Sequence, residues 1–178
     1  MKPDRPFEMI ALEDLAPDHF ERVALWLSKS TINRWLSPEW RYKEASASVI
    51  AITLRNRRNR LFLVRHEGEP CGLVALADIE NADRTAMVWY LLGDDRLSGR
   101  GIISAAVRQL ASLAFSEIGL ASLYAWTMED NVASQQVLRN AGFREVGRLR
   151  QSACSADRQV DRIYFDLIPG EIQSEYSR

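Results

Sequence analysis

The sequence predicts a mixed α/β domain in which helices cover both faces of a single sheet. Three observations favour this fold class. The first third of the chain has the apolar spacing of helices, residues 61–92 change to the two-residue alternation of strands, and helices and strands take turns from residue 101 onward. At 178 residues the chain suits one domain over 1–178, which would bury roughly 70% of the surface that its unfolded form exposes.

The amino-terminal third is expected to form one short strand and three helices. Residues 7–12 read as the strand, and apolar stripes predict helices over about 16–29, 31–36 and 43–57. Pro38 is expected to break the second helix, because proline lacks the amide hydrogen that a helix interior needs.

Short polar turns predict that the next three strands form an antiparallel meander. These strands cover 61–66, 71–78 and 85–92. The remaining expected elements are a helix over 101–117, a strand over 122–128, a helix over 131–141, strands over 143–150 and 161–168, and a frayed tail over 171–178.

Composition and charge exclude several classes of function. The net charge is -1 and the isoelectric point is about 6.2, whereas proteins that bind nucleic acid or membrane surfaces are usually basic. No apolar run approaches the roughly 20 residues that cross a bilayer, and no signal peptide is recognisable, so we expect a cytoplasmic protein. Cys71 and Cys154 lie far apart without metal-ligand spacing, and we expect neither a metal site nor a disulfide.

The run Arg-Leu-Ser-Gly-Arg-Gly-Ile at 96–102 connects the strand over 85–92 to the helix over 101–117. Unbonded amide groups and the positive end of the helix dipole meet at such a turn, which predicts a site for a phosphate-bearing ligand. Ile102-Ile103 replaces the Lys-Ser/Thr pair of the Walker motif, and Ser104 replaces the third glycine of the Rossmann fingerprint, so neither loop fits. The candidate ligand-binding residues are Arg96, Ser98, Gly99, Arg100, Gly101 and Ile102.

A second motif, Asn131-Val-Ala-Ser134 followed by Asn140-Ala-Gly142-Phe143, comes about thirty residues after the glycine turn, with a strand between them. Together the two motifs resemble the GNAT superfamily of acetyl-CoA-dependent N-acetyltransferases. The residues of the second motif are most similar to those of the branch of ribosomal-protein alanine, spermidine and sugar-nucleotide acetyltransferases. The resemblance covers roughly residues 61–167. It implies about seven mostly antiparallel strands, splayed at the fourth and fifth, with acetyl-CoA bound in the gap.

The resemblance also implies roles for individual residues. The backbone at Leu91 and Leu92 would pair with the pantetheine amides, while N–H groups of residues 98–102 would hold the pyrophosphate. Asn131 can cap its helix and would also contact the cofactor arm. Ser134 would lie near the departing sulfur, where its hydroxyl could stabilise or protonate the thiolate.

The sequence departs from the family at two catalytic positions. Leu138 stands where many members carry a tyrosine that acts as the acid, and Met87 stands where relatives often carry a glutamate. Because an acceptor amine is mostly protonated at neutral pH, another group must take its proton. We expect Asp78 to be that base, with turn capping as its alternative role, and Glu80 to share its strand face near the substrate. Trp35, among the first helices that cover the acceptor pocket in the family, is a candidate substrate contact.

The resemblance therefore implies direct transfer of an acetyl group from acetyl-CoA to a primary amine of a peptide amino terminus or a small molecule. A sugar-nucleotide amine and a polyamine are alternative acceptors, because the arginines of 54–60 favour an anion and nearby acidic residues favour a cation. A non-catalytic acyl-CoA-binding module is the alternative from another class, and the slightly acidic chain argues against nucleic acid as a partner. No covalent intermediate is expected, and strand edges would permit a monomer or a homodimer.

Overall fold

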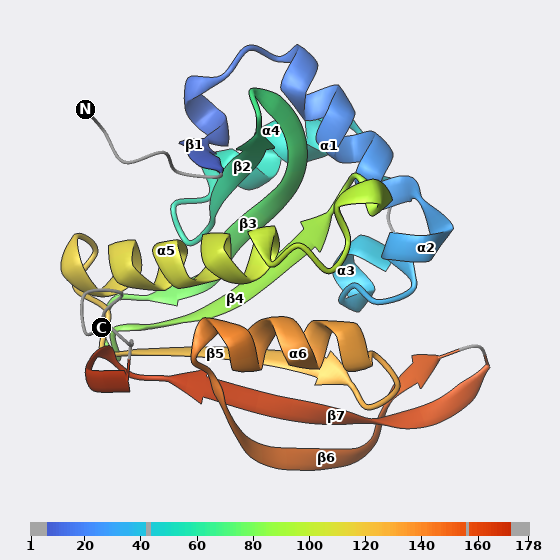
Figure 1. Cartoon of the computed structure of the whole chain (residues 1–178), viewed down its shortest axis with the longest axis vertical. Coiled ribbons are helices and arrows are strands. Elements are labelled where there is room, and N and C mark those ends of the chain that lie inside the picture. Colours follow the sequence, from blue (N-terminus) through green and yellow to red (C-terminus); the bar gives the residue numbers. More distant parts are fainter. Residues whose placement is uncertain (1–6, 42–43, 156, 172–178) are drawn as a thin grey trace.

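The computed structural model describes residues 7–41, 44–155 and 157–171, and its seven strands form one sheet in the order β1-β2-β3-β4-β5-β7-β6 (Figure 1). The strands are β1 (Glu8–Ala11), β2 (Arg60–His66), β3 (Glu69–Glu80), β4 (Thr85–Leu92), β5 (Ser122–Met128), β6 (Arg144–Ser155) and β7 (Arg158–Leu167). The α-helices are α1 (Asp18–Ser28), α2 (Ser30–Asn33), α3 (Pro38–Arg41), α4 (Ala47–Arg55), α5 (Ile102–Ser116) and α6 (Val132–Ala141). Short 3-10 helices are η1 (Leu12–Asp14), η2 (Asp95–Leu97) and η3 (Pro169–Glu171).

The amino-terminal half of the sheet is the antiparallel meander that the polar turns predict. Strands β1 to β4 pair antiparallel in chain order. β5 then lies parallel to β4, and β7 pairs antiparallel with both β5 and β6. The prediction of a mixed α/β fold with mostly antiparallel strands is therefore confirmed.

The pairing of β4 with β5 is short and determines the shape of the sheet. The residue pairs that join the two strands are Thr85 with Ser122, Ala86 with Leu123 and Met87 with Tyr124. Beyond these pairs β4 stays on β3 as far as Leu92, while β5 stays on β7 as far as Met128. The sheet therefore splays at its fourth and fifth strands, as the family resemblance implies.

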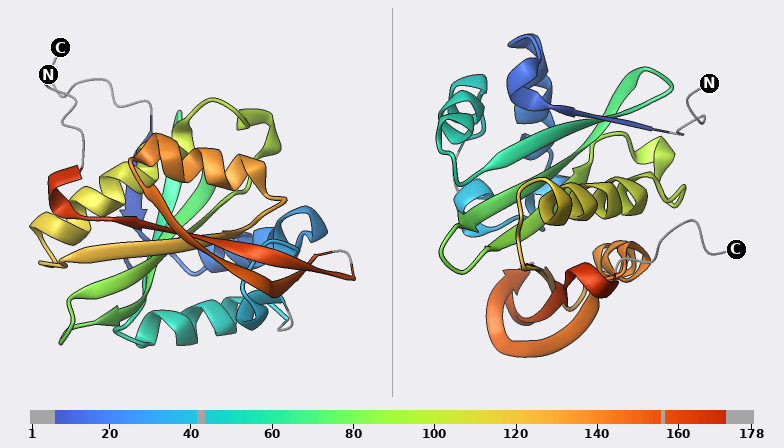
Figure 2. Two further views of the ribbon diagram at one scale, coloured as in Figure 1. Left: turned by 90° about the horizontal axis from the view of Figure 1, so that it is seen from below. Right: turned by 90° about the vertical axis from the view of Figure 1, so that its left-hand side faces the viewer.

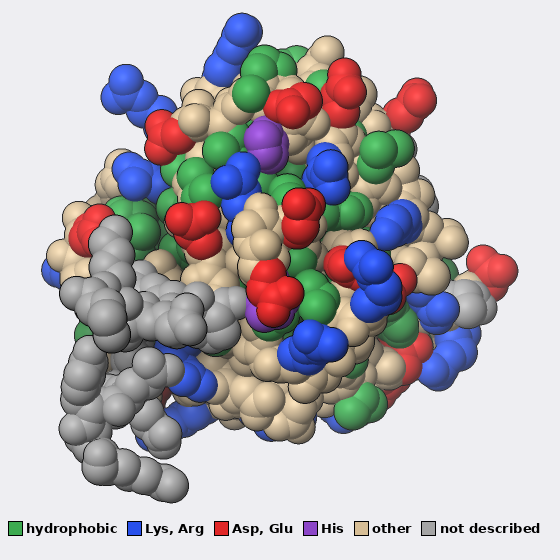
Figure 3. All heavy atoms as spheres, turned by 45° about the horizontal axis from the view of Figure 1, so that its top comes forward, with side chains coloured by type: hydrophobic (Ala, Val, Ile, Leu, Met, Phe, Trp, Pro, Cys, Tyr) green, Lys and Arg blue, Asp and Glu red, His purple; other side chains and the backbone are tan. Residues whose placement is uncertain are grey.

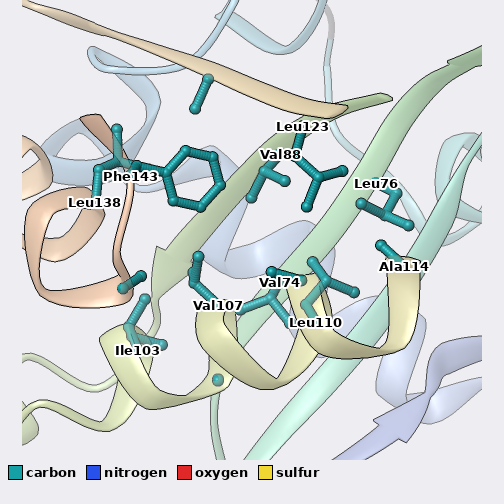
Figure 4. Packing of buried hydrophobic residues seen from close by; sticks show 14 of the residues in the cluster. Val74, Leu76, Val88, Ile103, Val107, Leu110, Ala114, Leu123, Leu138 and Phe143 are labelled. Atoms are coloured by element: carbon teal, nitrogen blue, oxygen red, sulfur yellow. The ribbon is translucent and has the colours of Figure 1, made fainter. Parts of the chain in front are cut away.

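Helices cover both faces of the sheet because strand residues alternate between two apolar cores. Figure 2 shows α5 and α6 on one face and α4 on the other. On β2, Phe62 and Val64 belong to the core under α5, whereas Leu61 and Leu63 belong to the core under α1 and α4. The apolar stripe of α5 points into the first core in Figure 4, and each fully buried leucine there contributes about 2 kcal/mol relative to exposure.

Some elements differ from the sequence expectation for local reasons. Pro38 begins α3 instead of only ending the helical segment, because proline fits the first turn of a helix, where the amide hydrogen has no partner. The helix expected over 43–57 begins only at Ala47, after Ser46 caps it by accepting a 3.3 Å hydrogen bond from the Val49 amide; residue 43 lies outside the described residues. The helix expected over 31–36 is the single turn of α2.

The carboxyl-terminal end also differs from the expected strands and tail. β6 runs on to Ser155, because its ladder with β7 resumes after an irregularity between Leu149 and Ala153. Glu171 was expected to begin a frayed tail, but it ends η3 and its carboxylate lies 2.8 Å from the Arg144 guanidinium. The rest of that expected tail, residues 172–178, lies outside the described part of the chain.

The described helices include none that is long and apolar enough to span a membrane. On the face around the amino-terminal helices and strands, acidic and basic side chains are mixed and do not gather by sign (Figure 3). This face therefore lacks the basic field that would attract a polyanion.

Gly93 joins the end of β4 to the helical layer at a point of close packing. A Cβ at this position would overlap the ring of Trp26, which is buried on α1, and the Gly93 carbonyl accepts a 2.9 Å hydrogen bond from Lys29. We expect Gly93→Ala to lower the free energy of unfolding by about 2 kcal/mol, because α1 must move to make room. Denaturant unfolding followed by circular dichroism measures this change.

Gly147→Ala is the matched control, because a Cβ at Gly147 on the exposed strand β6 meets no atom within 4 Å. Its free energy of unfolding should change by less than about 0.5 kcal/mol. Equal losses in the two variants would contradict a specific role for the packing of Gly93 on Trp26.

Candidate active site

A cavity of about 740 Å³ extends along the line where β4 and β5 separate. Its walls come from β4, β5, the glycine turn and the starts of α5 and α6, and also from the segment between α2 and α4 and the end of β3. Elements that are far apart in the sequence therefore share one continuous space.

The glycine turn has a backbone that requires glycine at two positions. Gly99 and Gly101 have φ values of 77° and 76°, a region that other residues adopt only at a cost. Gly101 is the residue that caps the amino terminus of α5. No atom lies within 4 Å of a Cβ built on either glycine, so the space beside the turn is open to a ligand.

The start of α5 presents backbone donors that no protein group uses. Between the glycine turn and the first helical hydrogen bond, no acceptor among the described residues bonds the amides of Gly99, Gly101, Ile102, Ile103 and Ser104. The first hydrogen bond of the helix is formed by Ala105, whose amide donates to the Gly101 carbonyl at 3.0 Å. Clustered free donors at the positive end of a helix dipole suit a phosphate or pyrophosphate group.

Two amides of the turn that we expected to bind the pyrophosphate already have partners. The Ser98 amide donates to the Asp95 carbonyl at 3.1 Å, and the Arg100 amide donates to the Leu97 carbonyl at 3.3 Å. Ser98 still lines the cavity with its neighbours. The free amides of Ile103 and Ser104, further along the helix, were not foreseen, because a sequence does not reveal where the first helical hydrogen bond forms.

The side chains of Arg96 and Arg100 lie outside the cavity walls. The Arg96 guanidinium is 89% exposed and donates two hydrogen bonds, of 2.9 and 2.8 Å, to the Asp94 carboxylate. The hydrogen bond from Arg96 outweighs partial burial and, together with the charge of Lys29, lowers the pKa of Asp94 to about 2. Arg96 is therefore held by its neighbour at neutral pH, and an incoming phosphate would compete with Asp94 for it.

The free edge of β4 faces the cavity. Leu91 and Leu92 line it, and the edge that Met87 shares with β5 carries no further strand pairing beyond that residue. Backbone groups along such an edge can pair with an extended ligand in the way that another strand would. This is the position that the family resemblance gives to pantetheine.

Asn131 and Ser134 lie at the start of α6, on the opposite side of the splay. The Asn131 side-chain oxygen caps the helix by accepting a 3.1 Å hydrogen bond from the Ser134 amide, and both residues line the cavity. The Tyr90 hydroxyl lies 2.8 Å from Ser134 Oγ and donates to the Ser134 carbonyl at 2.9 Å. Tyr90 was not foreseen as a site residue, because only the tertiary structure brings β4 and α6 together.

The sequence predicts that Asp78 and Glu80 share a strand face, but the structure places only Asp78 on the cavity wall. A bulge between Ala77 and Glu80 gives Asp78 a φ of 51° and breaks the simple alternation on which that expectation rested. Asp78 lines the cavity. Burial of the Tyr124 hydroxyl raises its pKa, and the negative charge of Asp78 raises it further. Glu80 lies outside the walls, 3.7 Å from the Arg58 guanidinium.

Tryptophan side chains line much of the cavity away from the glycine turn. Trp35, the candidate substrate contact, lines it together with Trp40, Trp89 and Trp126. Trp40 and Trp89 contact each other with ring centroids 5.6 Å apart and planes tilted by 42°. Such rings bind the apolar part of an amine and attract its cationic part through their faces.

The charged side chains on the described cavity walls are all acidic, and they are Glu39, Asp78 and Asp95. The arginine-rich segment 55–60 contributes only Asn56 and Asn59 to the walls. Its arginines are exposed elsewhere, so the cavity itself has a negative lining. Among the described residues no three His, Cys, Asp or Glu side chains are grouped to hold a metal ion.

The two positions at which the chain departs from the family supply no acid or base. Leu138 is fully buried among apolar residues that include Phe143, as Figure 4 shows, and Met87 lines the cavity where β4 leaves β5. A thioether and an aliphatic side chain cannot move a proton in this reaction. Proton transfer must therefore involve other residues or water.

Comparison with known proteins assigns the family. Residues 10–144, about three quarters of the chain, match the model of the acetyltransferase (GNAT) domain. The chain belongs to the GNAT acetyltransferase family. Its relatives include the putative ribosomal N-acetyltransferase YdaF of Bacillus subtilis, with 26% identity over 96% of this chain and 91% of that protein. The spermidine N(1)-acetyltransferase of Escherichia coli is 26% identical over 54% of this chain and 51% of its own length.

Solved GNAT structures share the fold of this acetyltransferase. The spermidine N-acetyltransferase of Vibrio cholerae, in complex with CoA and spermine, aligns with a TM-score of 0.81 and 16% identity over 94% of this chain and 98% of that one. The ribosomal L7/L12 α-N-protein acetyltransferase RimL, in complex with coenzyme A, aligns with a TM-score of 0.77 and 19% identity over 93% and 95%. The chain is thus an N-acetyltransferase of the GNAT fold, and the expected class of enzyme is confirmed.

The Asp94–Arg96 pair predicts a competition that can be measured. We expect Asp94→Asn to tighten binding of coenzyme A by about two- to fivefold at low ionic strength, because a released guanidinium can bind phosphate with charge-assisted hydrogen bonds. The asparagine oxygen can still accept the Arg96 amide hydrogen bond of 3.1 Å that the carboxylate accepts now. Isothermal titration calorimetry gives the dissociation constants.

The same substitution in an Arg96→Ala background is the control. The gain in affinity should disappear there, because the guanidinium that would bind the phosphate is absent. A gain of equal size in both backgrounds would assign the effect to the lost negative charge of Asp94 alone and would contradict the release of Arg96.

Proposed function

We propose that this enzyme transfers an acetyl group directly from acetyl-CoA to a primary amine of a peptide amino terminus or a small molecule. The observation that carries the proposal is that one cavity contains three features: the free amides at the start of α5, the open edge of β4 and a tryptophan-lined region. The first two suit the pyrophosphate and the pantetheine arm, and the third leaves room for an acceptor.

Acetyl-CoA supplies the acetyl group as a thioester, whose carbonyl carbon the acceptor amine attacks without a covalent enzyme intermediate. The backbone amide of Leu92 would polarise the carbonyl oxygen, since the amides of Gly93 and Asp94 already donate to the Cys71 carbonyl, and Ser134 would lie on the side of the departing sulfur. A thiol with a pKa of about 8.5 is a good leaving group, so modest stabilisation of the thiolate is enough.

Asp78 is the base in this proposal, directly or through a water molecule. Asp78 lines the cavity, and its carboxylate accepts no hydrogen bond from the described residues, which favours a role toward substrate over turn capping. Glu80, by contrast, accepts a 3.1 Å hydrogen bond from the Ala82 amide and therefore stabilises the turn.

We propose that the acceptor carries a positive charge beside an apolar part of the same molecule. Glu39 and Asp78 on the walls favour a positive charge, and the tryptophans favour an apolar flank. The diphosphate of a sugar nucleotide would meet these carboxylates and gain nothing from the arginines of 55–60, which lie outside the walls. The names of the relatives, a ribosomal-protein and a spermidine acetyltransferase, fit this choice, and we propose that the enzyme acts in the cytoplasm.

An amine panel tests the function. The purified enzyme is incubated with acetyl-CoA and, separately, peptides with free amino termini, polyamines and amino-sugar nucleotides, and both thiol release and product mass are recorded. We expect turnover with a peptide or a small cationic amine and none with the nucleotide. Binding of coenzyme A without turnover on any acceptor would instead support a non-catalytic acyl-CoA-binding module.

The two carboxylates of the bulged strand can be separated by mutation. Asp78→Asn should lower the rate of acetyl transfer about 100-fold, because the amine then lacks its base, while the dissociation constant of coenzyme A stays unchanged. Glu80→Gln is the matched control and should change the rate less than about twofold, since Glu80 lies outside the cavity. Steady-state kinetics across pH measure both, and an unchanged rate in Asp78→Asn would exclude Asp78 as the base.

A further inference from the structure

The Tyr90 hydroxyl bridges the splay between β4 and α6. It lies 2.8 Å from Ser134 Oγ and 2.9 Å from the Ser134 carbonyl oxygen, and both residues line the cavity. The pleat of β4 sets this direction: Tyr90 and Val88 face the core under α5, whereas Trp89 and Leu91 face the core under α1 and α4. Tyr90 therefore lies on the α6 side of β4, the strand whose free edge would pair with the pantetheine arm in the proposed function.

We propose that Tyr90 positions the Ser134 hydroxyl to donate a hydrogen bond to the departing sulfur. This inference rests on the proposed function, since it assigns a role at the same site. Tyr90 thereby performs, from β4 and through a serine, part of the task that many family members give to a tyrosine at the position of Leu138. Leu138 itself is fully buried in the apolar core and cannot take part.

The number of protons limits the arrangements of the pair. A tyrosine hydroxyl has one proton and a serine hydroxyl has one. When Tyr90 donates to the Ser134 carbonyl, the Ser134 hydroxyl donates to Tyr90 and is occupied. When Tyr90 donates to Ser134 Oγ, the Ser134 proton is free to point into the cavity. Negative charge on the sulfur favours the second arrangement, because hydrogen bonds to charged acceptors are the stronger ones.

Neither hydroxyl gives up its proton in this step. The bond between the acceptor nitrogen and the acetyl carbon forms, and the bond between that carbon and sulfur breaks with its electron pair on sulfur. The nitrogen loses a proton to Asp78 or water, and the thiolate takes one from solvent after it leaves. Burial raises the pKa of Tyr90, an effect that outweighs the hydrogen bond with Ser134, so its phenolate form is disfavoured. Tyr90 is thus a positioning residue.

The test uses the full chain and the variants Tyr90→Phe, Ser134→Ala and the double variant. The direct measurement is the pKa of the thiol of bound coenzyme A, followed by the ultraviolet absorbance of the thiolate during a pH titration. A hydrogen bond to the thiolate lowers this pKa. Removing it should raise the pKa by about one unit in Ser134→Ala and by a smaller amount in Tyr90→Phe.

Kinetics give a second measurement. We expect kcat to fall about tenfold or more in Ser134→Ala and about fivefold in Tyr90→Phe, with the KM for acetyl-CoA changed less than twofold. The double variant should be no slower than Ser134→Ala, because Tyr90 acts through the serine. Tyr164→Phe, which removes a hydroxyl from β7 outside the cavity walls, is the matched control and should leave kcat unchanged.

Two outcomes would overturn the inference. One is a Tyr90→Phe enzyme with unchanged kcat and unchanged thiol pKa. The other is a double variant whose loss is the product of the single losses, together with a lower melting temperature and weaker binding of coenzyme A, which would show that the hydroxyl only holds α6 in place. Because the titration needs no acceptor, it decides this question even if the amine panel finds no substrate.

Discussion

The short parallel pairing between β4 and β5 is the constraint on which the rest of the structure depends. Three residue pairs hold the two strands together, and after Met87 each strand stays with its antiparallel neighbour. A longer pairing would fill the β4 edge and close the cavity, whereas no pairing would leave two separate sheets. The antiparallel ladders on either side supply the rigidity that lets the middle of the sheet remain open, and the cavity follows from this compromise.

The alternation of β4 then distributes functions between the two sides of the sheet. Tyr90 and Leu92 belong to the side of α5 and α6, where the free amides and the helix dipole lie. Trp89 and Leu91 belong to the side of the amino-terminal helices, where the cavity is lined by tryptophans and carboxylates. A single strand thus contacts both the region suited to the nucleotide and the region suited to the acceptor, and the backbone between them is the point at which the two substrates can meet.

Sequence reasoning succeeded where one local signal determines the structure. The meander follows from two-residue alternation and polar turns. The start of α5 follows from Gly101, whose positive φ favours glycine. Sequence reasoning failed where the local structure depends on the packing of two segments that are distant in the sequence. The bulge at Asp78 depends on how β3 meets β4, and the contact of Tyr90 with Ser134 depends on the splay; neither leaves a local pattern. The pairing of Arg96 with Asp94 is local, but a sequence does not show whether the guanidinium binds the Asp94 carboxylate or the phosphate of a ligand.

The charge distribution along the cavity suits two unlike substrates in its two regions. At the start of α5 the positive field comes from backbone amides, which suit an anion and cannot be neutralised by pH, although Asp95 adds one carboxylate beside the turn. In the tryptophan-lined region the described charges are carboxylates, which attract an ammonium group and can accept its proton. Glu39 and Asp78 would disfavour an anion in the second region, so a nucleotide that entered reversed would meet unfavourable charge there. In the proposed function, electrostatics would therefore help to orient the nucleotide, and the acceptor nitrogen would lie near Asp78, the carboxylate proposed to deprotonate it.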